Sequence, residues 1–224
     1  MTLEKALAKQ CASVLDSRND WYEWPILGNH LPDGIVLPEG NAFSQTLALK
    51  SQLSTLYANA DAQKRTALTR YYIFRWGGVR GNSDERYRSY AHDQPSALIS
   101  RGVQGVASWS KALNMREPAH FAIYDARVAA SINSLQVIEA VETPTLFPLL
   151  QTKNGAIKIG NEALRKHAGA GNWQAINKSV FYQTYNQLLA TVAQKLNVST
   201  TVVEMFLFAR SVDFLRSAFP RQEF

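Results

Sequence analysis

Hydrophobic positions recur at helical spacing along most of the chain. In residues 2–17 the apolar stripe consists of Leu3, Leu7, Cys11 and Val14. In residues 42–60 it consists of Leu47, Leu49, Leu53, Leu56 and Tyr57. Apolar residues three or four positions apart share one face of an α-helix, so both segments are predicted to be amphipathic helices.

Clear start and stop signals mark a third helix over residues 61–76. Asp61 is a favourable N-cap residue, and the pair Gly77-Gly78 ends the pattern. The preceding segment, residues 23–41, holds three prolines and three glycines. Prolines and glycines at this density interrupt regular structure, so we expect an irregular loop there.

The last third of the chain is also predicted to be helical. One long amphipathic helix is marked by Trp173, Ile176, Val180, Phe181, Leu188, Val192 and Leu196. A final helix is expected to open at Thr201, with Glu204 completing a capping box, and to bury Val203, Phe206, Leu207, Phe214 and Leu215. Residues 143–161 fit a loop or a short hairpin. The predicted architecture is an all-α helical bundle with long irregular loops, one unit over residues 1–224 whose best break between two subdomains is 143–161.

Composition adds several negative expectations. The chain has 224 residues, 46% hydrophobic and 19% charged, which is typical of a globular protein. We expect no membrane span and no signal peptide, and the single Cys11, placed on an apolar stripe, is expected to be a buried thiol in a cytoplasmic protein. The four histidines show no metal-ligand spacing, so neither a metal nor another cofactor is expected.

The net charge of +6 is concentrated in one segment. Residues 64–90 contain seven basic residues and two acidic ones, and tyrosine, phenylalanine and tryptophan alternate with the arginines. Arginine neutralises phosphate, and aromatic rings offer stacking surfaces to bases. Inward-packing aromatics beside solvated arginines would give the same pattern, but the density of the cluster favours nucleic acid as the partner.

A glycine-punctuated turn follows this basic segment. Residues 94–101 are predicted to form a short helix with Pro95 in its first turn, and residues 107–115 a second one that ends before Pro118. Between them, Gly102 and Gly105 permit a tight reversal with positive φ. Backbone N–H groups in such a turn, at the start of a helix, can hold a phosphate without reading sequence.

Two chemically active side chains come next. Lys111 lies on the second of these helices, and Asp125 follows an apolar, extended stretch and begins the helix of residues 126–135. Aspartate at that position is a good N-cap, worth about 1 kcal/mol. A carboxylate held at a helix start can also stabilise a cationic transition state or accept a proton, so capping and catalysis are compatible.

Helix, two-glycine turn, lysine and aspartate together resemble the helix-hairpin-helix DNA glycosylases, most closely their 8-oxoguanine glycosylase branch. The likeness rests on Gly102 and Gly105, on Lys111, and on AIYDARVAAS at residues 122–131, and it covers about residues 94–135. It implies a helix-hairpin-helix element within the all-α fold. It also implies an enzyme that acts on double-stranded DNA, and we expect the protein to be a monomer.

The resemblance assigns roles to particular residues. A damaged or modified base would be flipped into a pocket, Asp125 would assist cleavage of the N-glycosidic bond, and Lys111 would attack the sugar to form a Schiff base. The residues expected to contact DNA are Gly102, Gly105, Arg75, Arg80 and Arg127. Those expected to line the base pocket are Tyr71, Trp76, Trp109 and Tyr124.

The sequence departs from the family pattern at the hairpin. The family has Leu-Pro-Gly-Val-Gly with the lysine two positions later, whereas here the proline is absent and Lys111 lies six positions after Gly105. The added turn keeps the lysine on the same helix face. Three alternatives stay open: a monofunctional glycosylase that uses water, a non-enzymatic DNA-binding protein, and a helical protein-interaction module centred on residues 70–80.

Overall fold

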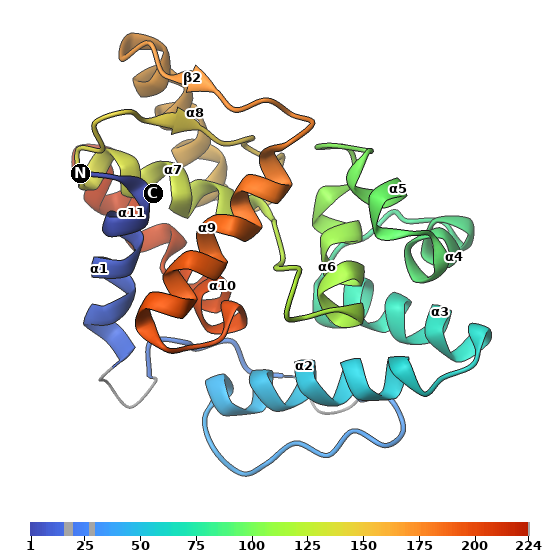
Figure 1. The fold of residues 1–224 in the computed structure, drawn as a ribbon. Helices are drawn as coiled ribbons and strands as arrows, with labels where there is room; N and C mark the ends of the chain where they lie inside the picture. Colours follow the sequence, from blue (N-terminus) through green and yellow to red (C-terminus); the bar gives the residue numbers. More distant parts are fainter. Residues whose placement is uncertain (16–19, 27–29, 224) are drawn as a thin grey trace. The chain divides into compact units, whose positions relative to one another are not determined.

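The computed structural model describes residues 1–15, 20–26 and 30–223 (Figure 1). The chain divides into two compact units: unit 1 is Met1–Trp21 with Tyr124–Phe224, and unit 2 is Tyr22–Ile123. In the described ranges the only strands are two residues long and the other regular elements are helices. The predicted all-α class is therefore confirmed.

Unit 2 contains the helices drawn in cyan to green in Figure 1. They are α2 (Ala42–Ala58), α3 (Ala62–Arg70), the π-helix η2 (Tyr71–Trp76), α4 (Asp84–His92), α5 (Pro95–Ile99) and α6 (Val106–Arg116). Local chemistry explains their starts. The side chains of Asn41, Asp61 and Ser83 accept hydrogen bonds from backbone N–H groups in the first turns of α2, α3 and α4. In the irregular loop expected over residues 23–41, residues 23–26 and 31–41 contain no helix or strand, His30 has 3-10 helical conformation, and residues 27–29 lie outside the described part.

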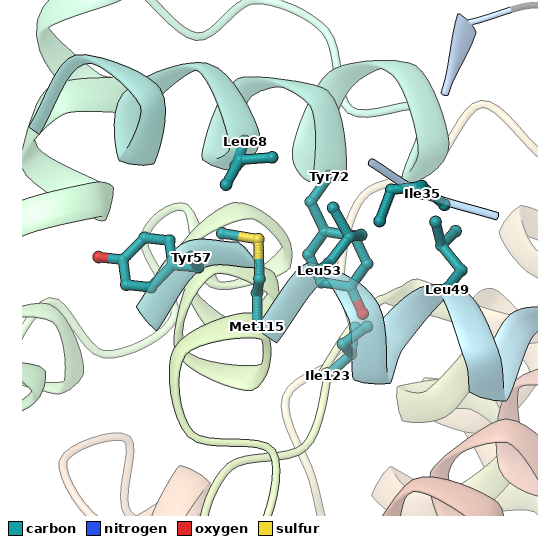
Figure 2. Packing of buried hydrophobic residues seen from close by; sticks show 8 residues of the cluster. All are labelled: Ile35, Leu49, Leu53, Tyr57, Leu68, Tyr72, Met115 and Ile123. Carbon is teal, nitrogen blue, oxygen red and sulfur yellow. The ribbon is translucent and has the colours of Figure 1, made fainter. Parts of the chain in front are cut away.

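The core of unit 2 forms where α2, α3, η2 and α6 meet. Figure 2 shows Leu68 and Tyr72 pointing toward Leu53 of α2, with Met115 of α6 beside them. The Tyr72 hydroxyl donates to Asn114 Oδ1 at 2.8 Å, and Asn114 Nδ2 donates to the Phe121 carbonyl at 2.8 Å. Because these buried polar groups satisfy one another, α6 is held in one register against η2.

Unit 1 is built around α7 (Ala126–Ile138), most of which is buried. Its other elements are α1 (Leu3–Leu15), β1 (Thr145–Leu146), α8 (Gly155–Ala170), β2 (Gln174–Ala175), α9 (Phe181–Leu196), α10 (Thr200–Ala209) and α11 (Ser211–Ala218). Helices α1, α8, α10 and α11 all pack on α7. Lys9 of α1 forms an ion pair of 2.8 Å with the buried carboxylate of Glu139, directly after α7. The predicted helix of residues 2–17 is found over 3–15, and residues 16 and 17 lie outside the described part.

Residues 143–161, the expected break between subdomains, lie inside unit 1. They contain β1, which pairs in parallel with β2, and the beginning of α8. Side chains of α7 bind this segment: Gln136 exchanges hydrogen bonds with the backbone of Thr145, and Asn133 does the same with Phe147. A segment tied to the central helix in this way belongs to the unit's core, and sequence periodicity does not show such bonds.

The C-terminal third departs from the predicted helices at two places. The long helix begins at Phe181 rather than near Trp173, because Gln174–Ala175 pair with β1 and Asn177 caps a turn through Ser179 N. The predicted final helix is two helices, α10 and α11, separated at Arg210. The N-cap of α10 is Ser199, so Glu204 lies too far along the helix for a capping box and is buried instead.

Two glycines of α8 give a matched stability test. A Cβ at Gly160 would lie 2.9 Å from Leu215 Cγ, whereas a Cβ at Gly169 would meet no atom within 4 Å. We expect Gly160→Ala to destabilise the protein by about 1–3 kcal/mol through overpacking. Gly169→Ala should be neutral or stabilising by up to ~1 kcal/mol. Urea unfolding measures both, and equal effects would contradict the packing of α8 on α11.

Candidate functional site

The turn before α6 has the backbone geometry that its glycines suggested. Gly102 has φ +58° and Gly105 has φ +71°, so the predicted positive φ is confirmed at both positions. Gly105 occupies the N-cap of α6 without a side chain to cap it. Its carbonyl accepts from Ser108 N and Trp109 N, and the Trp109 indole N–H donates to the Gln104 carbonyl at 3.0 Å. The turn is thus fixed to the helix it precedes.

Several amides of this turn are unused. Within the described part of the chain, the N–H groups of Val103, Gly105 and Ala107 have no hydrogen-bond acceptor. Clustered amides at a helix start attract an anion, because the N–H dipoles and the helix dipole add. The turn can therefore receive a phosphate.

Lys111 lies in the second turn of α6 and is buried, with only 3% of its surface exposed. Its Nζ donates to the Ala107 carbonyl at 3.1 Å, one turn back along the same helix. Fully burying an amine is unfavourable, and lysine is among the residues most rarely found inside proteins. Lys111 is therefore not an ordinary surface lysine whose charge is solvated by water, and its burial needs another explanation.

The arginine-bearing loop of residues 77–82 is attached to α6 at both ends. At one end, Gly77 approaches the Lys111 side chain so closely that a Cβ there would lie 2.5 Å from Lys111 Cε. At the other end, Asn82 Nδ2 donates to Ser108 Oγ at 3.0 Å. The loop therefore runs beside the first turns of α6, and it presents Arg80, which is exposed.

The remaining cations of the basic segment fall into two groups. Some are engaged within unit 2: Arg70 pairs with Asp84, and Arg65 donates to the carbonyls of Tyr57 and Ala58. Arg101, which follows the segment, is likewise paired with Asp93. Others are exposed, and no protein carboxylate lies in salt-bridge range of them among the described residues: Lys64, Arg75, Arg80, Arg86 and Arg88. The second group is the one able to neutralise an external phosphate.

A second buried lysine, Lys50, is a feature that the sequence interpretation missed. It is 5% exposed, and its Nζ lies 5.6 Å from the centroid of the Trp76 ring, which also stacks on Tyr72 at 4.6 Å. The helical spacing of the hydrophobic positions in residues 42–60 could have predicted that Lys50 is buried. Lys50 falls in line with the other buried positions of α2, which include Phe43, Thr46, Leu53 and Tyr57. Gly77 and Asn82 were also missed, because their contacts with α6 join segments about thirty residues apart in sequence.

Asp125 has the capping role that its position predicts. Its Oδ1 accepts from Arg127 N at 2.9 Å and from Val128 N at 3.1 Å, which satisfies two amides at the start of α7. Tyr124, directly before it, is fully buried and donates to the Pro148 carbonyl. Burial, together with the negative charge of Asp125, raises the pKa of Tyr124 well above its usual range, so this phenol stays neutral.

Arg127, another of the predicted DNA contacts, is half-buried within unit 1. Its Nη1 donates to Ser211 Oγ at 3.1 Å, and its guanidinium lies 5.3 Å from the Phe208 ring centroid. Burial lowers the pKa of Arg127, and the Asp125 carboxylate opposes that shift. Within unit 1, Arg127 therefore ties the start of α7 to the start of α11.

The four aromatic residues expected in a base pocket differ in accessibility. Trp109 and Tyr124 are fully buried and donate hydrogen bonds to backbone carbonyls. Stacking on a base would require each to leave these contacts. Tyr71 and Trp76 are half-buried, so these two remain the candidates for stacking.

Lys111 belongs to unit 2 and Asp125 to unit 1, so the structure describes each residue within its own unit. Lys111 lies within α6, and Asp125 lies at the start of α7; most residues of both helices are buried. Rigid elements of this kind hold a functional group more precisely than loops do.

Comparison of the chain with protein-family models, curated proteins and solved structures found no match. Within the described ranges, no group of three or more His, Cys, Asp or Glu side chains is arranged to hold a metal ion. No described helix is both long and apolar enough to cross a membrane. Cys11 is buried, as expected from its stripe, and burial raises the pKa of its thiol to about 12.

The bond between Asn82 and Ser108 can be tested by a double-mutant cycle. We expect Asn82→Ala and Ser108→Ala each to lower the free energy of unfolding by about 0.5–1.5 kcal/mol. The double variant should lose little more than one single variant, because both changes remove the same hydrogen bond. Additive losses in chemical denaturation would show that the loop is not held to α6 by this contact.

Proposed function

We propose that this protein is a DNA N-glycosylase with an associated lyase activity, in which Lys111 is the nucleophile and Asp125 the acid–base and electrostatic partner. The observation that carries the proposal is the buried amine of Lys111 on the helix that follows a turn with unpaired amides. Desolvation disfavours the charged form of an amine, and only the neutral form can attack carbon.

Binding would use the groups that unit 2 leaves available. The amides of Val103, Gly105 and Ala107 can hold one backbone phosphate, and exposed arginines such as Arg80 can neutralise others. Neither contact reads sequence. Such binding suits an enzyme that must inspect any stretch of duplex for a base that can be flipped out.

The chemistry follows from the two side chains. The Lys111 amine adds to C1′ of the flipped nucleotide as the bond from C1′ to the base breaks, and the base leaves with the electron pair and takes up a proton. Asp125 stabilises the positive charge that develops on the sugar and accepts a proton from the attacking amine. Opening of the sugar ring then gives a protonated Schiff base, from which strand cleavage by elimination proceeds.

Borohydride trapping tests this mechanism, because hydride reduces the Schiff base to a stable amine that links protein to DNA. The substrates are duplexes that each carry one damaged or modified base, 8-oxoguanine among them. We expect a covalent adduct with at least one substrate, and no adduct from Lys111→Ala. Lys50→Ala, which removes the other buried lysine of unit 2, is the matched control and should still form the adduct.

Asp125 needs a variant that separates capping from catalysis. Asparagine caps a helix about as well as aspartate, so Asp125→Asn should keep the stability of α7 while it removes the charge. We expect the rate of base release to fall by a factor of about 10²–10⁴. The melting temperature should stay close to that of the wild type. Wild-type rates in Asp125→Asn would reduce Asp125 to a cap.

The outcomes separate the candidate functions. Abasic sites without an adduct, lost in Asp125→Asn, would indicate a monofunctional glycosylase that uses water. DNA binding with neither product across the panel would favour the non-enzymatic DNA-binding alternative, for which the turn amides and exposed arginines suffice. No DNA binding at all would leave a helical protein-interaction module.

The salt dependence of DNA affinity tests the phosphate contacts directly. We expect Arg80→Ala to lower the slope of log K against log[salt] by about 1, because one fewer counterion is released. Arg165 of α8 is also exposed and lies outside the turn and the loop proposed to contact DNA, so Arg165→Ala makes the same change in net charge without removing a proposed contact. Equal slopes for the two variants would remove Arg80 from the proposed DNA interface.

A further inference from the structure

Gly77 is a glycine that its own backbone does not require. It follows the last residue of η2 with φ −82° and ψ −6°, a right-handed conformation open to every residue. Its neighbour Gly78 has φ +66°, where glycine is favoured for backbone reasons. The backbone dihedral angles of residue 77 therefore do not by themselves require glycine.

Two groups leave no room for a side chain at residue 77: the stem of Lys111 and the backbone carbonyl of Tyr72. A Cβ on Gly77 would lie 2.5 Å from Lys111 Cε and 2.8 Å from Lys111 Cδ, well inside van der Waals contact. It would also lie 2.8 Å from the Tyr72 carbonyl, which accepts the hydrogen bond from Gly77 N at 3.0 Å. The lysine stem thus lies directly against the backbone of Gly77, in space that any larger residue would occupy.

The backbone at this point is fixed from two directions. The Gly77 bond to Tyr72 closes the wide turn of the π-helix, and the Tyr72 hydroxyl is bound in turn by Asn114 of α6. Asn114 and Lys111 are three residues apart on α6, so one helix carries both the lysine and the group that holds the surface against which it lies. π-Helical turns are often found at functional sites.

We propose that Gly77 is the positioning residue for the Lys111 amine: its missing side chain lets the lysine stem lie along the end of η2, which sets where the amine projects. This inference rests on the proposed function. Gly77 itself touches neither DNA nor the reacting atoms. It acts by leaving room for one conformation of a long and flexible side chain, which a larger residue would exclude.

Gly77→Ala tests the inference through the rate of borohydride trapping. The added methyl group must displace Lys111 Cδ and Cε, and misplacement of a reacting group by about 1 Å can cost on the order of 100-fold in rate. We expect a loss of that size, with DNA affinity and its salt slope unchanged. The pH profile of trapping should shift as well, because the displaced amine meets a different environment.

Gly78→Ala is the matched control. It strains a backbone at positive φ in the same loop, but a Cβ there would meet nothing within 4 Å. We expect it to lower the melting temperature and leave the trapping rate within about twofold of wild type, a change well below what a displaced nucleophile causes. If Gly78→Ala slowed trapping as much as Gly77→Ala, loop strain would explain both, and the inference would fail.

The remaining outcomes are distinct. If the wild type traps DNA and Gly77→Ala traps it equally fast, the positioning role is wrong while the proposed function stands. If the wild type traps no substrate, the proposed function and this inference fall together. Should Gly77→Ala not fold, NMR on the wild type decides: a nuclear Overhauser effect between Gly77 Hα and Lys111 Hε supports the contact, and its absence overturns it.

Discussion

The burial of α6 is the constraint on which unit 2 depends. Nearly every residue of this helix is buried, including four with polar or charged side chains: Ser108, Ser110, Lys111 and Asn114. A buried polar group must find a partner or destabilise the fold. The neighbouring segments supply several of these partners: Asn82 donates to Ser108, and Tyr72 to Asn114. The loop of residues 77–82 and the π-helix are therefore held in place by hydrogen bonds to the buried polar side chains of α6.

A similar arrangement operates in unit 1 around α7. Its first turn is capped by Asp125, and its buried amides Asn133 and Gln136 bind the backbone near β1. The residue proposed as catalytic partner is thus also the residue that starts the central helix. Joining the two roles holds the carboxylate at a fixed position. It also means that removing the side chain altogether would disturb the fold as well as the chemistry.

Most elements could be predicted because they depend on neighbours along the chain. The N-cap at Asp61, Pro95 in the first turn of α5, the end of η2 before Gly77 and the positive φ at Gly102 all follow from local chemistry. Two expectations that also used local patterns were wrong. The long C-terminal helix begins at Phe181, and Glu204 is buried outside any capping box. In the first case the pairing of β2 with β1, 29 residues earlier in the chain, overrides helical periodicity.

The sequence by itself determined the all-α class, the turn geometry before α6 and the capping position of Asp125, because each depends on backbone preferences within a few residues. Only the tertiary structure decided which cations are buried and which are available. Lys50 and Lys111 are enclosed, Arg70 and Arg101 are paired, and Arg80 is exposed. The physical reason is that burial and ion pairing depend on segments far apart in the chain, and a charged residue has the same local signature in both situations.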